Sequence, residues 1–189
     1  LNKLGLIGTS ISPMGVISLE DSPERQLIRA KRFFKDNFIK EKLIINVKQH
    51  KLIRIGYFSG NFYEHAVSHL LVRTLELHNK DKFKVFSYSF SKGKSDKYTD
   101  RFTTASDYYR DVNNFSDLEV AKLVVSDEID IAIDLMGYSD NNRHGIFAYK
   151  PAPIQISYLG YPCTTGSDVI DYIIADKYLI PKHQLKYYS

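Results

Sequence analysis

The sequence DIAIDLMGYSDNNRHGIFAYKPAPIQISYLGYPCTTGSDVIDYIIAD, from Asp130 to Asp176, decides the fold class of this chain. It holds three short apolar runs, each followed by residues typical of turns: Ile131–Met136, Ile154–Leu159 and Tyr172–Ala175. Runs of this length, rich in β-branched and aromatic residues, predict buried strands of a parallel sheet. Ligands of open α/β sheets bind at the carboxyl ends of the strands, so the turns after these runs are where we expect function.

The residues before this stretch alternate between strand and helix patterns. They predict strands at 52–58, 83–90 and 108–112, and helices at 23–40, 68–78, 97–104 and 116–127. Two helices have clear start signals, namely Ser22 before Pro23 and a capping box of Ser116 and Glu119. The alternation predicts an α/β fold, a doubly wound and mainly parallel sheet of the Rossmann-like kind.

Length and composition are those of one globular domain. The chain has 189 residues, of which 43% are hydrophobic and 25% charged, which suffices for one sizeable core but is short for two domains. We expect residues 1–50 to form an irregular segment and a linker helix, and residues 51–189 to form the α/β lobe. Because neither end carries a start or tail signal, we expect a piece of a longer protein.

Charge and cysteine content exclude several classes of protein. The net charge of +4 comes from dispersed Lys and Arg, with a denser run at Lys31–Lys51 that we interpret as a solvated helix face. Nucleic-acid binding would need a basic stripe with a reader motif, and neither is present. No segment resembles a membrane span or a signal peptide. The single cysteine, Cys163, fits a reducing compartment, so we expect a cytoplasmic protein that binds neither nucleic acid nor membranes.

An ordered series of motifs runs through the chain. In its second half these are Asp134-Leu-Met-Gly-Tyr-Ser, Arg143-His-Gly-Ile-Phe-Ala, Lys150-Pro-Ala-Pro-Ile-Gln, Leu159-Gly-Tyr-Pro-Cys-Thr-Thr-Gly and Asp171-Tyr-Ile-Ile-Ala-Asp. Upstream, Arg54-Ile-Gly-Tyr-Phe-Ser is followed by His65 and His69. Taken together, the motifs closely resemble the catalytic region of protein O-GlcNAc transferases and the related SPINDLY-type enzymes. The resemblance covers roughly residues 12–189.

The resemblance implies an activity shared between two lobes. This chain would be the amino-terminal lobe of a GT-B type glycosyltransferase that transfers N-acetylglucosamine from UDP-GlcNAc to Ser or Thr hydroxyls of proteins, with inversion. The UDP-sugar would be held mainly by a second lobe that is absent here, so we expect the fragment alone to be inactive. The resemblance implies protein or peptide acceptors, no cofactor, no catalytic metal and an upstream helical-repeat domain.

Two alternatives stay open at this point. One is a related transferase that uses another nucleotide sugar, such as fucose, or that glycosylates adhesins. The other is a non-catalytic α/β interaction module. A dehydrogenase is disfavoured, because the turn after the first predicted strand has only Gly60 where a dinucleotide fingerprint needs three glycines.

His65 is the candidate catalytic residue. It lies between the first predicted strand and the next helix, so it should face the strand carboxyl ends beside a helix amino terminus, which disfavours a protonated ring. The resemblance matches it to the histidine of the family's Phe-x-x-His motif, as general base or as a positioning residue. His65 and His69 are spaced like metal ligands on a helix, but no third ligand is evident.

The loop at 160–166, Gly-Tyr-Pro-Cys-Thr-Thr-Gly, is the second candidate region. Its hydroxyl groups can bond to sugar or phosphate oxygens, although a tight crossover loop would explain the composition equally well. With the resemblance, the expected substrate-binding residues at the rim of the cleft are Tyr138, Tyr161, Pro162, Thr164 and Thr165.

Four residues depart from the usual pattern of the family. Asn61 stands where an acidic residue is common, Met136 replaces asparagine, Lys150 replaces arginine and Cys163 replaces glycine. Cys163 matters most, because a side chain appears where the backbone can need room or a positive φ. We expect its thiol to be exposed and open to labelling. His144 is expected at the surface, since it lies in a polar segment.

Overall fold

The computed structural model describes residues 3–38 and 40–188. Helices and strands alternate as the sequence predicts. The elements are η1 (Pro13–Val16), α1 (Pro23–Phe38), β1 (Ile53–Ser59), α2 (Ala66–Glu76), β2 (Phe83–Ser89), α3 (Lys97–Ala105), β3 (Tyr108–Asp111), α4 (Asp117–Ser126), β4 (Ile131–Asp134), α5 (Gly145–Ala148), β5 (Ile154–Tyr158), β6 (Tyr172–Ile174) and η2 (Lys182–Tyr187). The first helix is predicted to reach about Lys40, whereas α1 extends to Phe38 and Lys40 is not helical; residue 39 lies outside the described residues.

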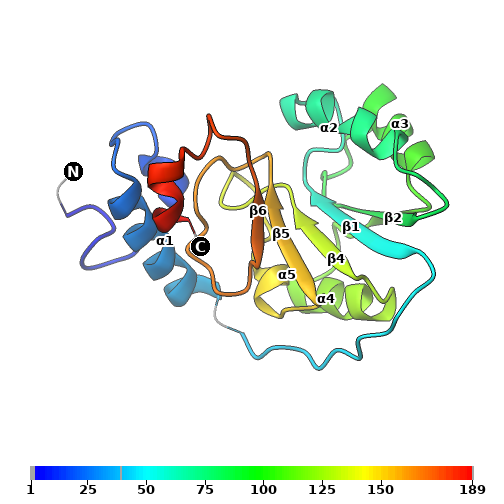
Figure 1. Cartoon of the computed structure of the whole chain (residues 1–189), viewed down its shortest axis with the longest axis horizontal. Helices are drawn as coiled ribbons and strands as arrows, with labels where there is room; N and C mark the ends of the chain where they lie inside the picture. The colour runs from blue at the N-terminus through cyan, green and yellow to red at the C-terminus, as the bar shows by residue number, and fades with distance from the viewer. Residues whose placement is uncertain (1–2, 39, 189) are drawn as a thin grey trace.

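The six strands are all parallel and lie in the order β3-β2-β1-β4-β5-β6 (Figure 1). Ile55 of β1 pairs with Val85 of β2 on one side and with Ile131 of β4 on the other. The predicted parallel, Rossmann-like sheet is therefore confirmed. Because β1 and β4 are neighbours but not consecutive, the chain leaves their carboxyl ends in opposite directions, and such a switch point is where doubly wound sheets bind ligands.

Both faces of the sheet are covered, as parallel strands require. Successive residues of a strand point to opposite faces, so Tyr57 and Phe58 of β1 enter different cores. Tyr57 belongs to the core under α2 and α3, which includes Leu71 and Phe102. Phe58 belongs to the core under α4 and α5, which also receives Phe34 of α1. Figure 1 shows these two helix layers on opposite sides of the sheet.

Side chains set the boundaries of the elements near the switch point. Asp134 ends β4 two residues earlier than the predicted run, because its Oδ1 accepts hydrogen bonds from the backbone N–H of Met136 (2.9 Å) and Gly137 (3.1 Å). α2 begins at Ala66, earlier than predicted, because the residue before it caps the helix. The capping box predicted for α4 is present, with the Glu119 carboxylate accepting from the Ser116 N–H at 2.7 Å.

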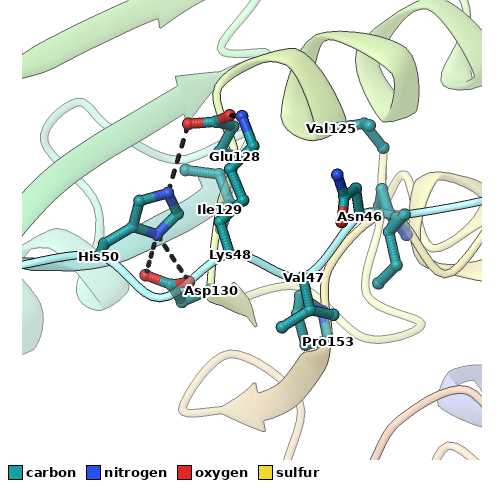
Figure 2. Close-up of a pocket in the computed structure, with 11 residues that line it drawn as sticks. Asn46, Val47, Lys48, His50, Val125, Glu128, Ile129, Asp130 and Pro153 are labelled. Atoms are coloured by element: carbon teal, nitrogen blue, oxygen red, sulfur yellow. Dashed lines mark hydrogen bonds and ion pairs between the residues drawn. The ribbon is translucent and has the colours of Figure 1, made fainter.

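α1 is packed onto the lobe, and an extended segment then leads to β1. Ala30 and Phe34 of α1 are buried, and Arg29 is buried in an ion pair with Glu20. Residues 40–52 form no helix or strand and pass along the edge of the molecule to β1 (Figure 1). Leu43 packs against the core beside α4 and α5. At the other end of the segment His50 lies between Glu128 and Asp130, with Nδ1 3.0 Å from Asp130 Oδ1 and Nε2 3.3 Å from Glu128 Oε2 (Figure 2).

Candidate functional site

The loops after β1 and β4 meet at the switch point. Ser59 is the last residue of β1, and its Oγ accepts a hydrogen bond from the Asn61 N–H at 2.9 Å. The side-chain amide of Asn61 lies with Nδ2 3.3 Å from the sulfur of Met136, which follows β4. Two of the four departures from the family pattern are therefore in direct contact, and the pair they form carries no charge.

His65 lies on the same edge of the sheet, as expected, and is the N-cap of α2. Its backbone is extended, and its Nδ1 accepts a hydrogen bond from the Val67 N–H at 3.2 Å. Capping satisfies a helix N–H that has no partner within the helix. An Nδ1 that accepts carries no proton, so the proton of the neutral ring is on Nε2. The ring in this arrangement offers a hydrogen-bond donor at Nε2.

The surroundings of His65 disfavour its charged form. Partial burial is the main factor that lowers the pKa of His65, and the positive charge of Lys94 and the His69 ring lower it further. The Tyr63 ring lies 5.8 Å from the His65 ring, and the Lys94 Nζ lies 4.2 Å from the centre of the Tyr63 ring. The neutral, donating form of His65 is therefore the form that this site stabilises near neutral pH.

The loop between β2 and α3 is tied to the turn that holds His65. The Asp96 carboxylate caps α3 and also accepts the Glu64 N–H at 2.6 Å. His69 is exposed on α2, with its Nδ1 2.9 Å from the Tyr98 hydroxyl. Within residues 3–38 and 40–188, no three His, Cys, Asp or Glu side chains converge as metal ligands would. Of the two histidines, His65 caps α2 and His69 contacts Tyr98 of α3.

The predicted substrate-binding residues come together, but in the interior. Tyr138, Tyr161, Thr164 and Thr165 are each at most 3% exposed, and only Pro162 is partly exposed. This corrects the expectation of hydroxyl groups at an open cleft rim. The reason is that α1 covers the loop: its side chains Phe33 and Phe38 contact the Tyr138 ring.

Tyr138 joins the loop after β4 to the loop after β5. Its hydroxyl donates a hydrogen bond to the Thr165 carbonyl at 2.7 Å. Burial raises the pKa of Tyr138 far above its ordinary value, so the hydroxyl keeps its proton and remains a donor. The two loops are also in close backbone contact, because a Cβ on Gly160 would lie 1.9 Å from the Leu135 carbonyl oxygen. In this chain the predicted substrate-binding tyrosines and threonines hold together the loops after β4 and β5 from the interior.

Cys163 differs from its prediction in burial and in backbone. Its thiol is half-buried, and burial raises its pKa to about 11. Cys163 is not among the residues with positive φ, so the backbone accommodates a side chain at this position. The expected exposed and reactive thiol is therefore wrong.

His144 is the residue that the sequence interpretation missed. It is fully buried, not at the surface as expected, and its Nδ1 lies 2.9 Å from the Asp134 Oδ2. Phe34, Phe38 and Tyr138 surround its ring. Among the described residues its Nε2 has no hydrogen-bond partner. The signal in the sequence was the apolar run that follows His144, which predicts a buried helix start.

A parallel sheet in this strand order, with its switch point between β1 and β4, is a Rossmann-like α/β lobe. The sequence profile of glycosyl transferase family 41 matches residues 27–189, and the chain belongs to this family.

Relatives and a solved structure agree with this assignment. The probable UDP-N-acetylglucosamine–peptide N-acetylglucosaminyltransferase SEC of Arabidopsis thaliana is 38% identical over 139 residues, 74% of this chain and 14% of the relative. The UDP-N-acetylglucosamine–peptide N-acetylglucosaminyltransferase of Caenorhabditis elegans is 34% identical over 137 residues, 72% of this chain and 12% of the relative. A mutant O-GlcNAc transferase from Thermobaculum terrenum superposes with a TM-score of 0.85 at 31% identity, covering 93% of this chain and 35% of that one.

The chain thus spans only a small part of the proteins it matches. None of the helices in the described part of the chain has the length and apolar character needed to cross a membrane.

Proposed function

We propose that this chain is the amino-terminal lobe of the catalytic region of a protein O-GlcNAc transferase. The whole enzyme would transfer N-acetylglucosamine from UDP-GlcNAc to Ser or Thr hydroxyls of protein or peptide acceptors. The names of the family 41 relatives and of the solved structure support this activity. The observation in this chain that carries it is the place of His65, capping α2 where the switch point opens.

The proposed reaction is a single displacement. The acceptor oxygen forms a bond to the anomeric carbon while the bond from that carbon to the UDP oxygen breaks, and UDP departs with the electron pair. Such a reaction gains most from correct placement of the reactants and from charge stabilisation at the diphosphate. We assign the charge stabilisation at the diphosphate to a second lobe outside this chain. The reaction as proposed requires no metal or cofactor.

His65 has a definite role in this proposal. Because its Nδ1 accepts the Val67 N–H, its Nε2–H is a donor and has no lone pair to receive a proton. His65 would therefore hold an oxygen of the substrate, and the proton of the acceptor hydroxyl would pass to another base. Of the two roles open to this histidine, the geometry favours positioning over general-base catalysis.

The cellular setting completes the proposal. A single half-buried cysteine is compatible with a reducing compartment, which supports the cytoplasm. Helical repeats upstream of the lobe are proposed from the family resemblance.

The test is sugar transfer by the full-length protein that contains this chain. Incubation with UDP-GlcNAc and a Ser-containing peptide should add one N-acetylhexosamine, seen by mass spectrometry. His65→Ala should lower kcat by roughly 10²–10³, the usual cost of losing one positioned donor. His69→Ala is the matched control and should stay near wild-type activity. Transfer of a different sugar would contradict the assignment of UDP-GlcNAc as the donor. Near-normal transfer by His65→Ala would contradict the assignment of His65 to the site.

A further inference from the structure

A lysine-lined hollow of about 360 Å³ lies outside the site described above. It is formed by α1, the residues that follow α1, the end of α5 and the crossover between β5 and β6. Lys31 and Lys35 are one helical turn apart on α1, so they project from the same face. Lys40 and Lys42 complete the rim, and Asp168 is the one acidic residue that lines it.

The hollow carries an excess of positive charge, with four lysines against one aspartate. Among the described residues, the side-chain ammonium groups of its four lysines have no ion-pair or hydrogen-bond partner. Several cations elsewhere in the chain are paired with carboxylates, as in Arg29–Glu20, Lys48–Glu128, Arg110–Asp127, Arg143–Asp117 and Lys150–Asp171. Like charges gathered in one place repel each other and attract anions. A lysine near the end of α1 also complements the helix dipole, but this does not account for Lys31 or Lys42.

The floor of the hollow is apolar and firmly built. Phe34, Ala148 and Val169 line it and are each at least 93% buried by their neighbours. Gly166 brings the crossover loop against α1, since a Cβ there would lie 2.5 Å from the Lys31 backbone nitrogen. The crossover loop and α1 are therefore packed together before any partner binds, which reduces the conformational entropy lost on binding.

We propose that this hollow, made by Lys31, Lys35, Lys40 and Lys42 over an apolar floor, is a docking surface for an acidic segment of another protein. The segment would place an apolar side chain on the floor and Asp or Glu carboxylates against the lysine rim. Charge complementarity of this kind raises association rates and is sensitive to salt.

The structure favours an acidic peptide over a phosphate ligand. Phosphate sites commonly use backbone N–H groups at a helix amino terminus, whereas this hollow lies beside the carboxyl-terminal half of α1. Nucleic acid would require exposed aromatic rings for base stacking, and Phe34 is only 7% exposed. The rim contains no arginine, the residue that grips phosphate with two parallel hydrogen bonds.

Fluorescence anisotropy tests the proposal without requiring enzymatic activity. The probe is a labelled peptide of sequence Glu-Asp-Glu-Leu-Glu-Asp-Glu, compared with the Gln and Asn version of the same length. The acidic peptide should bind at 50 mM salt, bind more weakly at 300 mM and lose affinity by about tenfold with Lys31→Gln/Lys35→Gln. The amide peptide should bind at least tenfold more weakly than the acidic one.

The matched control removes two charges elsewhere. Lys82 and Lys122 are exposed outside the hollow, so Lys82→Gln/Lys122→Gln has the same net charge and should bind the peptide within about twofold of wild type. Thermal unfolding confirms that both double variants fold. Equal weakening by the control variant would overturn the proposal in favour of general charge attraction. A single-stranded oligonucleotide of equal charge that binds more tightly, and also depends on Lys31 and Lys35, would overturn it in favour of nucleic acid.

Discussion

The side-chain nitrogen of Asn61 lies 3.3 Å from the sulfur of Met136, at the switch point between β1 and β4. A thioether is a weak acceptor, so this contact holds the two loops together with little energy. An acidic residue at position 61 and an amide at position 136 would make a stronger, charged hydrogen bond in the same place. Because the two side chains are in contact, we expect their effects on stability to be coupled.

Asn61→Asp should lower the free energy of unfolding by about 1 kcal/mol, because the new carboxylate would face a sulfur that cannot donate to it. Met136→Asn supplies an amide donor at that place. The double variant Asn61→Asp/Met136→Asn should therefore recover stability, with a coupling energy of at least about 0.5 kcal/mol in a double-mutant cycle measured by urea unfolding. Strictly additive effects would show that the two side chains do not interact.

The activity of the full-length protein should depend on the protonation of His65. Burial, Lys94 and His69 lower its pKa, so transfer should persist at the ordinary histidine pKa of about 6.5. At lower pH a proton on Nδ1 would break the hydrogen bond from the Val67 N–H that orients the ring, so transfer should fall although Nε2 keeps its proton. The pKa of His65 is lower in the folded state than in the unfolded state. The free energy of unfolding should therefore decrease as the pH falls from the unfolded pKa to the folded pKa.

Lys94→Met should raise the pKa of His65 and move the acid side of the pH profile to higher pH. Lys97→Met is the control, since Lys97 pairs with Glu64 and does not lower the pKa of His65. NMR titration of the His65 ring measures the shift directly. An unchanged profile in Lys94→Met would remove this lysine from the site.

Cys163 should react slowly with thiol reagents in the folded protein. Its pKa of about 11 leaves roughly a hundredfold less thiolate near neutral pH than an exposed cysteine has, and partial burial hinders access further. The rate of labelling by an aromatic disulfide should rise steeply with pH and rise again in denaturant. Labelling at the rate of a free thiol at pH 7.5 would place the side chain in solvent.

His144→Ala should destabilise the protein by roughly 3–5 kcal/mol, because it leaves the buried Asp134 carboxylate without one of its partners. His183→Ala removes an exposed imidazole and is the matched control, with an expected change within about 0.5 kcal/mol. Urea denaturation of both variants gives the comparison. Similar small losses in both would mean that the Asp134–His144 contact contributes little.

Local signals predicted most of the fold. The capping box of Ser116 and Glu119 predicted the start of α4, and the apolar runs predicted the strands. Both signals depend on residues only a few positions apart. The placement of His65 beside a helix start was also readable from its neighbours.

Long-range packing set the features that the sequence did not reveal. Tyr138 and His144 are interior because Phe34 and Phe38, a hundred or more positions earlier, lie over them. The contact of Asn61 with Met136 depends on β1 and β4 being neighbours in the sheet, which pattern alone does not establish.

The packing of α1 makes this helix part of the same folded unit as the sheet. Phe34 belongs to the central core, and Phe33 and Phe38 cover Tyr138. A truncation that starts after residue 50 would remove these phenylalanines and would expose the Tyr138 and His144 rings, together with the buried carboxylate of Asp134, to water. Any shortened version intended for expression or crystallisation should therefore begin before Pro23.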